Sequence, residues 1–202
     1  MSLRAELVGS DAMPGFAVLL PDGWESNDAA FSDADERLRA RIDALPYESR
    51  AAARATMAQL FQTARSEAAR AEVIRVFTPV AGADGDILPV SLTASWLTAP
   101  VGSTAADLGA SLVQRFGAAP LDPGGTILRW ARDEQVDVEG GTVEVSGHGY
   151  LMQVPGRSTR ALVFRSSILR GAEGATIPPE GVAAMTPLCD AIVASVRWRR
   201  DG

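Results

Sequence analysis

Residues 142–170, TVEVSGHGYLMQVPGRSTRALVFRSSILR, decide the fold of this chain. Between residues 143 and 152, small or apolar residues alternate with larger and more polar ones, which is the two-residue period of a pleated strand. Pro155 and Gly156 interrupt the pattern as a turn, and the alternation resumes over residues 160–169. The stretch therefore predicts two long strands in a hairpin. An isolated hairpin is marginally stable in water, so we expect further strands beside it and helices over it.

The composition is typical of one folded, globular domain. Hydrophobic residues make up 47% and charged residues 22% of the 202 residues, unlike the composition of disordered chains. A chain of this length can bury one sizeable core. We therefore predict a single domain over residues 1–202 of the α+β class. Its antiparallel sheet of about six or seven strands would carry helices on both faces, as an α/β/α sandwich.

The rest of the chain supplies the other strands and the helices of this fold. Further strands are predicted at residues 15–20, 73–80, 88–98 and 126–131, and helices at residues 32–45, 47–72 and 104–116. We interpret the acidic stretch 133–139 as a solvated face or edge, and residues 118–125 and 171–180 as loops. A last helix is predicted to begin at Thr186, its N-cap, with Pro187 at the first helical position.

The helix over residues 104–116 has the clearest boundaries. Ser103 or Thr104 caps its start, and Asp107 completes a capping pattern. Apolar residues then recur at a spacing of four, which places them on one side of the helix. The predicted buried face consists of Leu108, Leu112 and Phe116.

The two helices within residues 32–72 form a predicted helical hairpin that interrupts the strand pattern as an insertion. On the second helix, Met57 and Phe61 lie on one apolar face, while Arg54 and Arg65 lie elsewhere. Two interpretations are open at this point: the apolar face docks on the protein's own sheet, or it is presented to a protein partner.

Trp24 is a further candidate for an interaction surface. It follows a turn formed by residues 21–23, in which proline and glycine supply the required backbone angles. A large aromatic residue at such a place either packs at the edge of the core or takes part in binding. The complete predicted interaction surface is Met57, Phe61, Arg54, Arg65 and Trp24.

Charge and composition exclude several classes of function. The net charge of -6 and the pI near 4.9 disfavour a nucleic-acid-binding protein, which needs a basic face. All 19 basic residues are arginine, so neither a Schiff-base lysine nor a P-loop lysine is present. Cys189 is the only cysteine, which rules out an intramolecular disulfide. The segment 197–200 contains three arginines and Trp198. Such a segment could meet a phosphate or an acidic partner, but we expect a solvated tail.

The apolar segments of the sequence do not resemble signal peptides or membrane spans. The first residues contain no apolar run of signal-peptide length. Residues 87–106 are uncharged, but prolines, a glycine and many serines and threonines interrupt them, so we interpret them as a buried strand and a turn. We therefore expect a cytoplasmic protein without membrane insertion.

No catalytic or metal-binding constellation is recognisable. His148 is the only histidine, and no G-x-S-x-G elbow accompanies it, so we interpret it as a strand residue that is partly exposed or hydrogen-bonded locally. One histidine and one cysteine cannot supply a usual zinc site, and no G-x-G-x-x-G loop follows a strand. We predict no catalytic residue, no metal and no cofactor.

The order of the predicted elements is similar to that of the PsbP-like family, an α/β/α sandwich also seen in the Ran-binding Mog protein and in small bacterial proteins. The resemblance covers about residues 15–198, with residues 32–72 outside the usual pattern. It rests on the early strand leading into Pro21-Asp22-Gly23-Trp24, a central hairpin, the helix 104–116, the hairpin 142–170 and a final helix running into residues 192–197. The resemblance implies an accessory or adaptor role, and it assigns no catalytic residue.

These observations favour a non-enzymatic protein-interaction or accessory module. Its partner would be a protein, with a bacterial secretion or envelope system as one setting, and the sequence leaves the oligomeric state open. The alternative is a small-molecule-binding protein or hydrolase with an aromatic-lined pocket, because ligand sites are mostly apolar with a few polar groups. The aromatic residues that would line this pocket are Trp24, Trp96, Trp130 and Tyr150.

Overall fold

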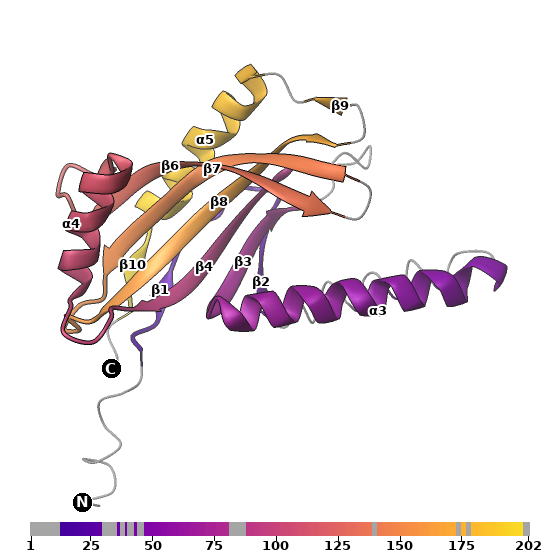
Figure 1. Ribbon diagram of the computed structural model, residues 1–202, viewed down its shortest axis with the longest axis horizontal. Helices are drawn as coiled ribbons and strands as arrows, with labels where there is room; N and C mark the ends of the chain where they lie inside the picture. The colour runs from indigo at the N-terminus through magenta and orange to yellow at the C-terminus, as the bar shows by residue number, and fades with distance from the viewer. Residues whose placement is uncertain are drawn as a thin grey trace, which may run out of the picture.

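The computed structural model describes residues 13–29, 47–80, 88–138, 141–172, 175–176 and 179–199, together with Glu36, Arg39 and Asp43. These residues form a mixed α+β fold, as predicted (Figure 1). The main sheet follows the order β2-β3-β4-β8-β7-β6-β5, and every neighbouring pair on this path is antiparallel. The path therefore agrees with the predicted antiparallel sheet.

The strands of the main sheet are β2 (Trp24–Asp28), β3 (Val73–Pro79), β4 (Val90–Thr98), β5 (Ala119–Pro120), β6 (Ile127–Val138), β7 (Gly141–Gln153) and β8 (Arg160–Ala172), with β9 (Ala175–Thr176) paired to β8. A separate pair consists of β1 (Phe16–Ala17) and β10 (Arg197–Trp198). The helices are α3 (Tyr47–Arg70), α4 (Ala105–Phe116) and α5 (Pro179–Ala194). The predicted helix over residues 32–45 lies outside the described residues, except for the helical Glu36, Arg39 and Asp43.

The predicted hairpin of residues 142–170 is present as β7 and β8, in the interior of the sheet. Strand β6 is longer than predicted, because the acidic stretch pairs with β7, with Asp133 opposite Ser146. Side chains 133–135 are exposed as expected. Strand β5 pairs with β6 only at Leu128 and Arg129, so among the described residues the acidic stretch pairs with β7 alone and lies at an edge of the sheet, as predicted. The predicted loops 118–125 and 171–180 were wrong in part, since they contain β5, the end of β8 and β9.

A serine side chain replaces part of the backbone ladder between β7 and β8. The backbone N–H of His148 donates to Ser166 Oγ at 2.8 Å, and this hydroxyl in turn donates to the carbonyl of His148 at 3.4 Å. Beside it, a Cβ added to Gly147 would lie 2.0 Å from the Ser166 carbonyl oxygen. Only glycine therefore fits at this close approach of the two strands.

Neighbouring residues of β7 pack against different helices. Tyr150 and Met152 belong to the main core cluster, which includes Ile192 and Val193 of α5. Leu151 belongs to a second cluster with residues of α4. Strand β7 thus contributes buried side chains from both alternating sets, which explains why its sequence is apolar at consecutive positions near residue 151.

Helix α4 begins and ends as predicted. Thr104 is its N-cap and forms a capping box with Asp107, and Gly117 ends it in the left-handed conformation with φ of 63°. The prediction of Phe116 as a buried residue was wrong: it is 53% exposed, under the guanidinium of Arg115. Phe116 is the last residue of the helix. The residues that pack inward are Ala105, Leu108 and Leu112.

Helix α5 begins earlier than predicted. It starts at Pro179, so Thr186 and Pro187 lie inside the helix rather than at its start. The Thr186 hydroxyl donates to the carbonyl of Val182 at 3.2 Å, an interaction of a helix interior. A proline inside a helix removes one backbone donor, but buried Cys189 and its neighbours hold this helix against the sheet.

Helix α3 projects from the body of the protein. Figure 1 shows it running outward from the β2–β3 side of the sheet, with only its C-terminal end beside the strands. The contact at this end is with β3, and Ala68 is buried there. The chain then turns into β3 through Glu72, which has a positive φ of 49°.

Residues 197–199 are not part of the solvated tail that the sequence suggested, and Arg200 lies outside the described residues. Trp198 of β10 lies opposite Phe16 of β1 and stacks on Trp96, with ring centroids 6.4 Å apart. Phe16 contacts the edges of Trp96 and of the buried Phe164. The aromatic residues thus fix the β1–β10 pair against β4 and β8.

Candidate functional site

The predicted interaction residues of the helical hairpin lie on α3. Arg54 is exposed and forms an ion pair with Asp43 at 2.6 Å, and Arg65 is also exposed. The side chains of Met57 and Phe61 lie outside the described part of the structure. Exposed ion pairs of this kind contribute little stability, because water and salt screen them.

One side of α3 is exposed along most of the helix. Tyr47, at the end far from the sheet, is 83% exposed. Exposed residues follow at spacings of three and four, which places them on one face of a helix. These residues are Ala51, Arg54, Ala58, Gln62 and Arg65. We call them, with Tyr47, the exposed face of α3.

Trp24 lies away from this exposed face. It is half-buried at the start of β2 and packs against two core clusters, one of which includes Phe77 and the other Cys189. Its backbone N–H closes the preceding turn by donating to the carbonyl of Pro21 at 3.1 Å. The indole therefore contributes to packing at the edge of the core.

A cavity of about 460 Å³ lies between residues 13–20 and the strands β2, β3 and β4. We call it the β3 cavity. Its volume falls within the range of about 300–1,000 Å³ that is usual for ligand sites. Large apolar and aromatic side chains form most of its wall: Phe16, Val18, Leu20, Ile74, Phe77 and Trp96. Ser26, Arg75 and Arg199 add polar groups.

A β-bulge in β3 shapes one wall of this cavity. Val73 pairs with Ser95 and Arg75 pairs with Ala94, so Ile74 is the extra residue of the bulge. Consecutive residues of a regular strand point to opposite faces, yet Ile74 and Arg75 both line the cavity. The bulge therefore places an apolar side chain and a guanidinium side by side on one wall.

The second arginine of the cavity comes from the other end of the chain. Arg199 follows β10, and its backbone N–H donates to the carbonyl of Gly15 at 2.8 Å. Its aliphatic stem lies over Gly15, where an added Cβ would come 3.3 Å from the Arg199 Cδ. Arg75 and Arg199 are both exposed, and among the described residues neither has an ion-pair partner.

The aromatic residues predicted to share a pocket are distributed over different parts of the core. Trp96 lines the β3 cavity. Tyr150 is fully buried in the main cluster, and Trp130 packs with α4 in the second cluster. Trp24 packs at the edge of the core, outside the cavity lining.

A polar network lies under α5, on β6 and β7. The hydroxyl of Tyr150 donates to Asp190 Oδ1 at 2.8 Å, and Arg129 Nε lies 3.2 Å from the same oxygen. Arg129 also contacts His148, with 2.8 Å between its Nη2 and the imidazole Nε2. An arginine can only donate, so His148 Nε2 is the acceptor and the imidazole is neutral.

Burial and neighbouring charges favour the uncharged forms of His148, Tyr150 and the nearby Cys189. Burial, followed by the charge of Arg129, lowers the pKa of His148. Burial and the hydrogen bond to Asp190 raise the pKa of Tyr150 well above its usual value. Burial also raises the pKa of the Cys189 thiol to about 12, so this thiol is not activated as a nucleophile. The network is suited to holding β6, β7 and α5 together.

A smaller hollow of about 280 Å³ lies beside this network, between the end of α4 and strand β6. Arg129 and His148 form part of its lining, together with Phe116 and Trp130. The Nδ1 atom of His148 is buried without a hydrogen-bond partner among the described groups. Because this atom is inaccessible to solvent, a molecule in the hollow cannot reach it without a movement of the ring.

Comparisons with known proteins place no constraint on the site. No family model matches the chain, and no curated protein matches it either. Within the described residues, no helix is long and apolar enough to cross a membrane. The same part of the chain contains no group of three histidine, cysteine or acidic side chains that could hold a metal ion.

Sequence reasoning did not identify the two arginines of the β3 cavity. Arg75 lies in a strand, where strict alternation would have placed it opposite Ile74, and the bulge that changes this leaves no local signal. Arg199 was grouped with a solvated basic tail. Its position in the lining of the same cavity as Arg75 depends on the pairing of β1 with β10, residues far apart in the chain.

Proposed function

We propose that this protein is a non-enzymatic interaction module that binds a protein partner through the exposed face of α3. The observation that carries the proposal is the direction of α3, which leaves the sheet and places most of its length outside the core (Figure 1). An exposed tyrosine at its outer end adds support, because tyrosine is enriched among the residues that dominate binding energies. A helix laid against a groove of the partner is the expected mode.

The proposed fold family agrees with this role. We propose that α4 and α5 cover opposite faces of the sheet, as in the α/β/α sandwich of PsbP-like proteins. The support comes from β7, where Leu151 packs with α4 while Met152 and Tyr150 pack with α5. We further propose an accessory function in the cytoplasm, by resemblance to that family. Fold resemblance supports such a role only by association.

Site-specific photo-crosslinking tests the role of α3. Benzoylphenylalanine is introduced at Ala58 or Gln62, both on the exposed face, and the labelled full-length protein is irradiated in native lysate. The expected result is the same discrete cross-linked protein from both positions. Benzoylphenylalanine at Gln114, an exposed residue of α4, is the matched control and should not yield that product.

A substitution of Tyr47 tests whether the cross-linked protein binds through the exposed face of α3. Tyr47→Ala should reduce the amount of cross-linked partner severalfold without changing the thermal midpoint, because Tyr47 is exposed. Val101→Ala removes another exposed apolar residue and serves as the control. Equal cross-linking from Gln114, or a yield unaffected by Tyr47→Ala, would show that α3 is not the binding element.

A second candidate function is the binding of a small molecule in the β3 cavity. The observation that favours it is the lining, which combines three aromatic rings with few polar groups. Dodecanol is a suitable apolar probe, and we expect it to raise the thermal midpoint of the full chain. Ser26→Trp, which fills the cavity from β2, should abolish this shift, whereas Ser158→Trp on an exposed turn should leave it unchanged.

A further inference from the structure

Two of the polar residues of the β3 cavity are positively charged, and they come from two separate elements. Arg75 is contributed by β3, and Arg199 by the segment after β10. None of the described residues of the lining is acidic. Asp28 lies opposite Arg75 in the strand register, but it is not one of the lining residues. The cavity is therefore a local cationic site in a chain whose net charge is -6.

The apolar part of the lining is continuous with these charges. Phe16 and Trp96 contact each other at a centroid distance of 6.1 Å, and Phe77 is 2% exposed beneath them. Ile74 stands next to Arg75 on the bulged strand. A ligand that filled the cavity would therefore meet aromatic and aliphatic side chains as well as the two arginines of the lining.

We propose that the β3 cavity binds an amphipathic carboxylate, with its hydrocarbon chain against Phe16, Phe77 and Trp96 and its carboxylate at Arg75 and Arg199. This inference rests on the second candidate function, small-molecule binding, and adds the chemical class of the ligand. Burial of a hydrocarbon chain supplies the non-directional part of the affinity. The planar guanidinium groups donate hydrogen bonds in the geometry that a carboxylate accepts.

A neutral apolar molecule would satisfy only half of this site. It would fill the aromatic part of the cavity but would offer no acceptor to the guanidinium groups of Arg75 and Arg199. A small anion without a hydrocarbon chain would meet the two guanidinium groups in an open, hydrated position, where such contacts are weak. The combination of both features is what selects an amphipathic anion.

The test compares dodecanoate with dodecanol, which has the same chain length and no charge, by isothermal titration of the full chain. Dodecanoate should bind more tightly than dodecanol, and Arg199→Gln should weaken dodecanoate binding by about tenfold to a hundredfold. Dodecanol binding should not change. Arg115→Gln, which alters an exposed arginine of α4, is the control and should affect neither ligand.

The outcomes separate this inference from the function on which it rests. Binding of dodecanol and dodecanoate with equal affinity, unchanged by Arg199→Gln and Arg75→Gln, would overturn the carboxylate assignment while small-molecule binding stood. Binding of neither ligand would overturn both. Dodecyl phosphate distinguishes the head group, and tighter binding of it by more than tenfold would refute the carboxylate in favour of a phosphate.

Discussion

Gly147→Ala should destabilise the protein strongly, because the added methyl group meets backbone rather than a movable side chain. Its Cβ would lie 2.0 Å from the carbonyl oxygen of Ser166 and 2.8 Å from the carbonyl carbon. To remove this clash, β7 and β8 must separate at the place where Ser166 Oγ already takes the role of a backbone hydrogen-bond acceptor. Overpacking usually costs about 1–3 kcal/mol, and we expect the upper end here. For a domain of this size, about 3 kcal/mol lowers the thermal midpoint by roughly 6–12 °C.

Thermal unfolding followed by circular dichroism measures this effect. Gly15→Ala is the control, because its Cβ would meet only the side chain of Arg199, at 3.3 Å. That side chain can move, so the midpoint should fall by less than about 4 °C. If only the native state is strained, the slope of the free energy of unfolding against urea concentration should be the same for both variants as for the wild type. A Gly147→Ala midpoint within about 2 °C of wild type would refute the close approach of the two strands.

Three other predictions concern the polar network and the start of β3. Tyr150→Phe removes the hydrogen bond to Asp190 and should lower the free energy of unfolding, measured in urea, by about 1.5 kcal/mol. This value is at the low end of the range for hydrogen bonds to charged groups, because Asp190 keeps its ion pair with Arg129. A double-mutant cycle with Asp190→Asn should show coupling between the two, and strict additivity would contradict the contact. The pKa of His148 is lower in the folded protein than in the unfolded chain, so as the pH falls the unfolded chain binds this proton at a higher pH than the folded protein does. Stability should therefore fall as pH decreases below about 6.5, and His148→Gln should remove that part of the pH dependence. Glu72 has a φ of 49°, so Glu72→Gly should be neutral or stabilise by up to about 1 kcal/mol, whereas Glu72→Val should destabilise; equal effects of the two would argue against backbone strain.

Local sequence signals predicted those elements whose structure is decided locally. The capping box at Thr104 and the glycine after α4 specify that helix through contacts a few residues apart, and both are present. The alternation in β4 likewise reflects burial along a single strand. The start of α5 was predicted wrongly because Thr186 and Pro187 form a good helix start locally. The packing of Met185 and Cys189 against the sheet overrides that preference.

The candidate site depends on contacts between distant residues, which a single sequence does not report. The β3 cavity requires the β1–β10 pair, which brings Gly15 next to Arg199. The role of Trp198 likewise follows from its stacking on Trp96. The acidic residues of β6 are a contrasting case: their polarity predicted an edge from the sequence alone, and β5 pairs only with Leu128 and Arg129, which leaves the acidic stretch at an edge beside β7.

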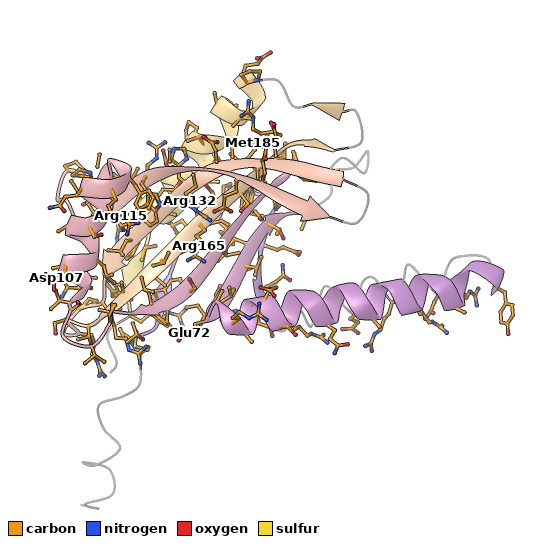
Figure 2. The ribbon with its side chains drawn as sticks, viewed as in Figure 1. Glu72, Asp107, Arg115, Arg132, Arg165 and Met185 are labelled. Carbon is orange, nitrogen blue, oxygen red and sulfur yellow. The ribbon has the colours of Figure 1, made fainter. Side chains whose placement is uncertain are left out.

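Helix α3 and the β3 cavity are connected by one short segment, residues 72–75. Glu72 ends the turn after α3 and accepts a hydrogen bond from the backbone N–H of Trp96 at 3.2 Å, while the bulge that follows directs Ile74 and Arg75 into the cavity. Figure 2 shows Glu72 close to the sheet end of α3. A substitution in this segment would therefore change both the direction of the helix and the wall of the cavity. For this reason Arg199, outside the segment, is the more informative of the two arginines, and Gln62 reports on the helix alone. If a variant loses ligand binding in the β3 cavity but keeps partner binding through α3, or the reverse, the two surfaces work independently.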